Sequence, residues 1–270
     1  MKNAAPSIRR FKQVKDVQKQ KPDNPLYIKK VGVKDLSYPI VVLDKKRGTQ
    51  HTVASINLYV DLPREFKGTH MSRFIEVLNE YREDIHIDKI EHIIKEIRDV
   101  LEATSAYMEI EFPYFIEKPS PVTGSEGLMD YTCTFKGMVG EKKDFRVGVK
   151  VPVMTMCPCS KEISENSAHS QRGIVTVEVK YKNFFWIEDL IALVENCASS
   201  PVYPILKRPD EKYVTEYAYA HPMFVEDVVR QISSELTKTG EFSWFSVEAE
   251  NMESIHNHNA YACIEGGDED

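Results

Sequence analysis

The order of periodic segments along the chain restricts its fold more than any other feature of the sequence. Apolar and polar residues first alternate as in half-buried strands, then recur every three or four residues as on one helix face, and then alternate again. In the first half these segments lie at 31–43 and 50–62 (strands), 74–81 and 90–101 (helices), and 108–112 and 129–138 (strands). A loop containing Pro, Gly and Ser is expected at 118–127, because such residues interrupt a strand ladder.

The second half shows the same order of segments without residue-level similarity to the first. Its segments lie at 145–154 and 175–181 (strands), 187–194 and 224–236 (helices), and 245–249 and 260–264 (strands). Each half thus has the order β-β-α-α-β-β, which predicts an α+β fold with two antiparallel four-stranded sheets, each carrying a helix pair on one face. Exposed sheet edges need partners, so we expect an oligomer joined edge to edge; a compact monomer with two packed sheets is the alternative.

The predicted units have flanking segments of distinct charge. Residues 1–26 are polar and basic without an apolar core, which predicts a flexible arm, or a segment ordered at a subunit interface, and not a secretory signal. The units themselves are expected at 27–140 and 141–265, the second carrying the candidate site, and 266–270 would form an acidic tail.

Charge and cysteine content exclude several classes of function. The formal net charge is -7 and no stretch approaches the roughly 20 apolar residues of a membrane span, so neither nucleic acid nor a membrane is an expected partner. Five cysteines, an odd number, in a chain without an export signal predict a cytoplasmic protein with reduced thiols. A close pair of cysteines in that setting indicates metal binding or catalysis.

Such a pair is formed by Cys157 and Cys159, which flank Pro158 at the predicted end of a strand. Pro158 forbids a regular ladder, so we expect both thiols on a loop, with His169 close by where the chain returns into the next strand. A thiolate and an imidazole that converge in this way suit Zn²⁺ or Fe²⁺. The alternative is a buried cysteine pair with an ordinary surface histidine.

Three further segments carry candidate functional side chains. The charged segment Lys207–Lys212, expected as a loop between two helices, could supply a carboxylate ligand and phosphate-binding cations, or be an ordinary solvated loop. His256 and His258, two apart on a predicted strand, would share its apolar face as proton carriers or as hydrogen-bonded core histidines. Glu226, early in the longest predicted helix, either complements the helix dipole or pairs with the N–H edge of a purine.

Taken together, these segments resemble the type IB GTP cyclohydrolases. The motifs that carry the resemblance are Cys157-Pro-Cys-Ser-Lys-Glu-Ile-Ser, Ala168-His169-Ser-Gln-Arg172-Gly, Tyr203-Pro-Ile-Leu-Lys-Arg-Pro-Asp-Glu211-Lys, Phe224-Val-Glu226-Asp, Glu253-Ser-Ile-His256 and His70-Met-Ser-Arg73. The resemblance implies two tandem tunnelling-fold (T-fold) units and a homotetramer with active sites between subunits. It also implies conversion of GTP and water to 7,8-dihydroneopterin triphosphate and formate, for folate or 7-deazaguanine synthesis.

The resemblance further implies roles for individual residues. Cys157, His169 and Glu211 would hold one divalent ion (Zn²⁺, Fe²⁺ or Mn²⁺) with a fourth position open for water. Cys159 would be a second active-site thiol, Glu226 the purine anchor, and His256 and His258 the proton carriers. Charge and location make Lys161, Arg172, Lys207 and Arg208 the candidates for the triphosphate, and His70 and Arg73 are expected to reach a neighbouring subunit's site. One departure, Ala220-His221-Pro222 where the family often has Glu-Asn-Pro, affects the expected pocket rim.

Two other functions fit part of the pattern. A T-fold NADPH-dependent nitrile reductase would use a cysteine and a purine-anchoring glutamate, but it would leave the Cys157, His169 and Glu211 set without a role. A non-catalytic zinc protein would use the Cys-x-Cys pair in a closed coordination shell. It would leave the paired histidines and the Lys/Arg segment unexplained.

Overall fold

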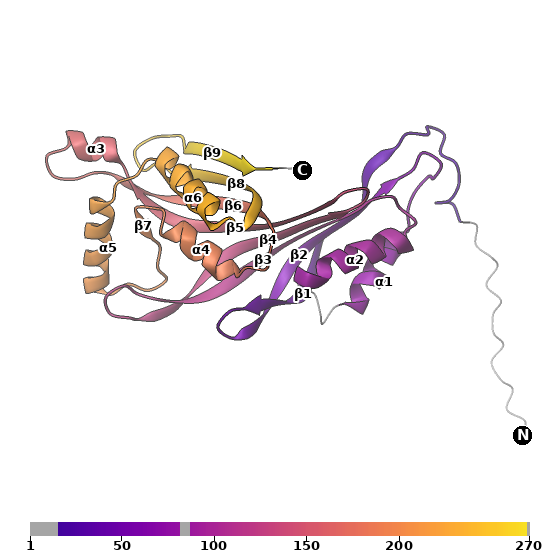
Figure 1. Ribbon diagram of the computed structural model, residues 1–270, viewed down its shortest axis with the longest axis horizontal. Coiled ribbons are helices and arrows are strands. Elements are labelled where there is room, and N and C mark those ends of the chain that lie inside the picture. The colour runs from indigo at the N-terminus through magenta and orange to yellow at the C-terminus, as the bar shows by residue number, and fades with distance from the viewer. Residues whose placement is uncertain (1–15, 82–86, 269–270) are drawn as a thin grey trace, which may run out of the picture.

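The computed structural model describes residues 16–81 and 87–268 and is built around one large antiparallel sheet (Figure 1). In the described residues the strand order is β1-β2-β3-β4-β5-β6-β8-β9, and the short β7 pairs with β5. The strands are β1 Ile28–Asp44, β2 Gly48–Leu62, β3 Ala106–Pro119, β4 Glu126–Val139, β5 Lys143–Met156, β6 Ser170–Tyr181, β7 Ser200–Pro201, β8 Phe242–Asn251 and β9 Ala260–Gly267. The α+β class predicted from the sequence is confirmed.

The described helices are α1 Met71–Glu80, α2 Ile87–Val100, α3 Pro158–Ile163, α4 Ile187–Glu195, α5 Arg208–Ala220 and α6 Val225–Thr239. α3 and α5 lie at one end of the sheet, and the other helices lie on one of its faces (Figure 1). In Figure 1, α2, α4 and α6 lie in front of the strands, and their apolar faces join a core drawn from both halves of the chain. Side chains on the opposite face form ion pairs instead, for example Arg146 with Asp144 (2.9 Å) and Lys150 with Glu111 (3.3 Å). The period-2 alternation along the strands produces this division.

The first half matches the predicted order of elements. It runs β1, β2, α1, α2, β3, β4, and the predicted helix faces are the buried ones: Phe74 and Leu78 on α1, and Ile93 and Ile97 on α2, are fully buried. The predicted loop at 118–127 is shorter than expected, because the β3–β4 ladder continues to the pair Pro119 and Glu126.

The second half departs from the predicted helix pair. The chain between β6 and β8 forms three helices, and a fourth, α3, lies between β5 and β6. The segment expected as a loop at Lys207–Lys212 is the start of α5, with Pro209 in its first turn, where proline is tolerated. The pattern missed α5 because its buried residues are few: Asp210, Val214 and Ala218.

The two halves share one sheet, which corrects the expectation of two separate sheets. The strands of each half are contiguous, β1 to β4 and then β5, β6, β8 and β9, but β4 pairs with β5 from Thr132↔Lys150 to Val139↔Lys143. Because β4 and β5 pair with each other, neither strand is an exposed edge, and the two halves form one continuous sheet. The outer strands of the described sheet are β1 and β9.

The described part of the predicted N-terminal arm contacts the first half. The carbonyl of Gln18 accepts hydrogen bonds from the main-chain N–H groups of Lys67 and Gly68, at 3.0 and 3.1 Å. Residues 1–15 lie outside the described residues, as do 269 and 270 of the predicted acidic tail, whose expected start at 266 falls inside β9. None of the described helices is long and apolar enough to cross a membrane.

Candidate functional site

Cys157 and His169 lie together where β5 ends and β6 begins. The β5–β6 ladder runs to its last pair, Met156 and Ser170, and the next residues outward are Cys157 and His169. The main-chain N–H of Cys157 donates to the carbonyl of His169 at 3.1 Å. The sequence-based expectation that the thiol and the imidazole meet at this hairpin end is confirmed for their main-chain positions.

The thiols do not lie on a plain loop, as predicted, but at a short helix. Cys157 is the N-cap of α3, and its Sγ accepts a hydrogen bond from the N–H of Ser160 at 3.4 Å. Pro158 occupies the first helical position, where its missing N–H costs nothing, and α3 therefore starts two residues after β5 ends at Met156. Cys157 is half-buried and Cys159, inside α3, is exposed.

The imidazole of His169 contacts the buried side chain of Gln171, which is itself bonded to buried Thr155. Its Nδ1 lies 3.0 Å from Oε1 of Gln171, whose amide nitrogen donates to the hydroxyl of Thr155 at 2.9 Å. Neither Gln171 nor Thr155 has a role that its sequence motif indicates. The sequence shows only that Gln171 is two residues from His169, and so can share its face of a strand. The position of Gln171 opposite Thr155 comes from the strand register.

Glu211 lies at the other end of α5 from this hairpin. Lys161 of α3 donates to the carbonyl of Tyr219, near the C-terminal end of α5, at 2.5 Å. Glu211, two turns away in the first turn of α5, is exposed and about 12 Å along the helix axis from that contact at the usual rise per residue. Among residues 16–81 and 87–268 of one chain, no three His, Cys, Asp or Glu side chains are grouped so that they could hold a metal ion.

The start of α6 is tied to the same end of the sheet as Cys157. The N–H of Met223 donates to the carbonyl of Met156 at 3.0 Å, and Glu226 follows in the first turn of α6, where it is exposed. The capping contact belongs to its neighbour, because the carboxylate of Asp227 accepts from the N–H of Phe224 at 3.2 Å. Glu226 is therefore not needed as the cap.

His256 and His258 are not on a strand, which corrects the prediction. β8 ends at Asn251 and β9 begins at Ala260, so both histidines lie in the exposed connection between them. Their rings stack on each other with centroids 5.1 Å apart. The connection starts beside the site, because the N–H of Met252 donates to the carbonyl of Arg172 at 2.9 Å.

A cavity of about 350 Å³ lies between the end of β5, the start of β6, the segment at 201–206 and the middle of α5. Its lining includes Arg172 and Gln171 on one side and Tyr203 and Val214 on the other. Of the four predicted triphosphate contacts, Arg172 lines this cavity. Lys161 contacts Tyr219, while Lys207 and Arg208 are at the Glu211 end of α5.

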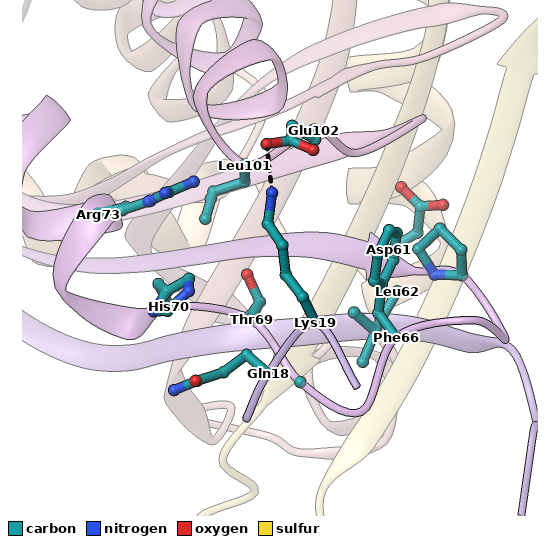
Figure 2. Close-up of a pocket in the computed structure, with 12 residues that line it drawn as sticks. Gln18, Lys19, Asp61, Leu62, Phe66, Thr69, His70, Arg73, Leu101 and Glu102 are labelled. Carbon is teal, nitrogen blue, oxygen red and sulfur yellow. Dashed lines mark hydrogen bonds and ion pairs between the residues drawn. The ribbon is translucent and has the colours of Figure 1, made fainter. Parts of the chain in front are cut away.

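His70 and Arg73 line a small pocket of the first half, shown in Figure 2. Lys19 of the N-terminal segment enters this pocket and pairs with Glu102 at 2.9 Å, and Arg73 donates to the carbonyl of Val100 at 3.0 Å. Figure 1 shows α1, which carries Arg73, at the opposite end of the molecule from α3 and α5. Within one chain these two residues are thus remote from Cys157.

Comparison of the fold places the chain among proteins with a large antiparallel sheet and helices on one face, like urate oxidases. The structure of urate oxidase from Bacillus sp. TB-90 matches with a TM-score of 0.53 at 10% identity, covering 90% of this chain and 100% of that one. A highly active mutant of that enzyme matches with a TM-score of 0.52, also at 10% identity, covering 90% and 100%. At these identities the likeness concerns the fold alone.

The chain belongs to the family described as Type I GTP cyclohydrolase folE2, whose model matches residues 14–262. A protein named GTP cyclohydrolase FolE2 from Syntrophus aciditrophicus is 62% identical over 251 residues, covering 93% of this chain and 98% of the relative. A protein of the same name from Geobacter metallireducens is 59% identical over 250 residues, covering 93% and 96%. The family resemblance expected from the motifs is confirmed.

Proposed function

We propose that this chain is a GTP cyclohydrolase, a hydrolase that opens the guanine ring of GTP at C8 and yields 7,8-dihydroneopterin triphosphate and formate. The observation that carries the proposal is the meeting of Cys157 and His169 at one hairpin end, in a chain that belongs to a family of GTP cyclohydrolases. We place the enzyme in the cytoplasm and its product in folate or 7-deazaguanine synthesis.

Cys157, His169 and Glu211 would hold one divalent ion, Zn²⁺, Fe²⁺ or Mn²⁺. The donor chemistry fits such an ion, because a cysteine and a histidine lie side by side in the main chain and a carboxylate is exposed on α5. When bound, the ion acts as a Lewis acid that lowers the pKa of water at the site. In one chain Cys157 lies near the C-terminal end of α5, whereas Glu211 lies in the first turn of that helix. We therefore propose that a second subunit supplies the third ligand.

The other side chains would bind and orient the nucleotide. The carboxylate of Glu226 is an acceptor for the N–H groups on the guanine edge, and its freedom from helix capping supports this role. Arg172, which lines the cavity, with Lys161, Lys207 and Arg208, would contact the triphosphate. Cys159, which is exposed on α3, would be the second active-site thiol.

His256 and His258 would carry protons during ring opening. Imidazoles exchange protons near neutral pH, and an exposed connection beside Arg172 can approach a bound nucleotide. His70 and Arg73 would act at the site of a neighbouring subunit, which their distance from Cys157 along the molecule favours. These roles require the proposed homotetramer, in which each chain would contribute two tandem T-fold units.

The first test is turnover of GTP across a series of divalent metals, with formate and a fluorescent pterin as the readouts. Cys157→Ala should lose bound metal and activity together, whereas Cys263→Ala, an exposed thiol on β9, should keep both. Glu226→Gln should raise KM for GTP while metal content stays unchanged. Full metal-dependent activity of the Cys157→Ala enzyme would overturn the proposal.

The second test asks whether the site is shared between subunits. Cys157→Ala and Glu211→Ala, each inactive alone, are unfolded together and refolded as mixed oligomers. If the thiol and the carboxylate come from different chains, about a quarter of the sites in a random mixture have both groups intact and activity returns. If both groups come from one chain, the mixture stays inactive.

A further inference from the structure

We propose that Gln171 is a positioning residue that holds the imidazole of His169 in the tautomer with hydrogen on Nδ1. In that tautomer Nε2 carries the lone pair and can ligate a divalent ion. The inference rests on the proposed function, since it takes His169 as a metal ligand. Gln171 would then belong to the site although the sequence motif alone indicates no role for it.

The contact geometry defines the tautomer. Nδ1 of His169 lies 3.0 Å from Oε1 of Gln171, and an amide oxygen can only accept a hydrogen bond. The ring nitrogen facing it must therefore carry the hydrogen. A neutral imidazole has one N–H, so Nε2 is left as the unprotonated nitrogen.

A second hydrogen bond orients the Gln171 amide. Its Nε2 donates to Oγ1 of Thr155 at 2.9 Å, which turns the amide oxygen toward His169. Thr155 and Gln171 are directly opposite each other in the β5–β6 ladder, and His169 is two residues before Gln171. The strand register thus aligns the three side chains on one face of the hairpin.

Burial makes this arrangement specific. Thr155 is 0% exposed and Gln171 is 7% exposed, so both side chains are shielded from water and the chain of hydrogen bonds from Thr155 through Gln171 to His169 lies largely inside the protein. Side chains that bond to metal-binding histidines in this way commonly set ring orientation and raise ligand basicity. The pair Thr155 and Gln171 has the chemistry and rigidity for that task.

The main chain of His169 is held by other groups. Its carbonyl accepts from the N–H of Cys157 at 3.1 Å, and its own N–H donates to the hydroxyl of Ser160 at 3.2 Å. Removing the Gln171 amide should leave these contacts intact and free only the ring. The positioning role can therefore be separated from a role in folding.

The test uses Gln171→Met, which keeps the length of the side chain without a strong acceptor, and Gln171→Glu, which keeps the acceptor. Affinity for Zn²⁺ and Mn²⁺ is measured on the full-length protein by chelator competition, and the tautomer of His169 in metal-free protein by NMR of ring-labelled histidine. We expect Gln171→Met to bind metal about 10–100-fold more weakly and to move His169 toward the Nε2–H form. Gln171→Glu should restore most of the affinity and the Nδ1–H form.

Wild-type affinity and an unchanged tautomer in Gln171→Met would overturn the inference. Gln50→Met is the matched control, because Gln50 on β2 also bonds a neighbouring strand (2.9 Å to the carbonyl of Phe115) in the first half, and it should leave metal affinity unchanged. If Gln171→Met fails to fold, Thr155→Val tests the same chain of hydrogen bonds. Unchanged metal affinity and an unchanged His169 tautomer in Thr155→Val would count against the inference.

His169→Ala distinguishes failure of this inference from failure of the proposed function. If His169→Ala binds metal as tightly as wild type, the metal site itself is wrongly assigned. If His169→Ala loses metal while Gln171→Met does not, His169 is supported as a metal ligand and only the positioning role of Gln171 is wrong.

Discussion

The carboxylate of Asp210 accepts hydrogen bonds from both the main-chain N–H and the hydroxyl of Thr123, each at 2.8 Å. Asp210 is the residue before Glu211 in α5, and Thr123 lies in the connection between β3 and β4. Burial alone would raise the pKa of Asp210, but the hydrogen bonds from Thr123, Lys207 and Val122 hold that pKa well below its usual range. The first half of the chain thus positions the helix that carries the proposed third metal ligand.

Removing this anchor should weaken both the helix and the metal site. Thr123→Val preserves side-chain shape but deletes the hydroxyl donor, so we expect the melting temperature to fall by about 2–4 °C and metal affinity to fall with it. Thr52→Val is a matched control, because its hydroxyl also bonds across strands (2.8 Å to the carbonyl of Pro113) away from α5. Equal metal affinity in both variants would show that the anchor does not position Glu211.

A second anchor, an ion pair that is also largely shielded from water, precedes α5 in the chain. Lys118 pairs with Glu195 at 2.6 Å, with side chains 11% and 12% exposed, and also donates to the carbonyl of Val202 at 2.7 Å. Burial lowers the pKa of Lys118, and the charge of Glu195 opposes that shift. Lys118→Met leaves Glu195 buried beside Tyr131 without its cation, which should cost about 3–5 kcal/mol in the free energy of unfolding.

Chemical denaturation would measure this loss. Glu195→Gln in the Lys118→Met background should recover part of it, because the uncompensated buried charge is then gone. Additive losses in the double variant would contradict the proposed coupling.

The five cysteines should differ sharply in reactivity. Burial raises the pKa of the Cys133 thiol, and it raises the pKa of Cys197 to about 11, whereas Cys159 and Cys263 are exposed. Because the thiolate is the reacting form, brief alkylation near neutral pH should label Cys159 and Cys263 and spare Cys133 and Cys197. Mass spectrometry of peptides would map the label.

Bound metal should change the alkylation of one cysteine, Cys157. Bound Zn²⁺ should protect half-buried Cys157 from the reagent and leave the labelling of Cys263 unchanged. Equal protection of both would argue against Cys157 as a ligand.

Alkaline pH should destabilise the first half through Tyr81. Its hydroxyl donates to Glu96 of α2, and this hydrogen bond, with burial, raises the pKa of Tyr81 from 10.0 to about 12. A raised folded-state pKa means that the contribution is complete below pH 10 and is lost as the pH rises from there toward about 12. Tyr81→Phe should flatten the fall of the unfolding free energy in that window, measured by urea titration; an unchanged slope would refute the link.

The sequence by itself determined the order of elements in the first half of this protein and the identity of its site motifs. Apolar period decides which face of a segment is buried, so the order β-β-α-α-β-β in the first half and the buried faces of Phe74 and Ile93 follow from short-range pattern. The approach of Cys157 to His169 also follows, because a hairpin brings residues close in sequence together.

The tertiary structure alone decided how distant segments meet. α5 carries few buried residues and depends on Asp210 and its contact with Thr123, which no local period reveals. His256 and His258 alternate like strand residues, yet the β8–β9 register places them in an exposed connection. The β4–β5 ladder and the link from Thr155 through Gln171 to His169 likewise depend on strand register, which is set by packing across the whole sheet.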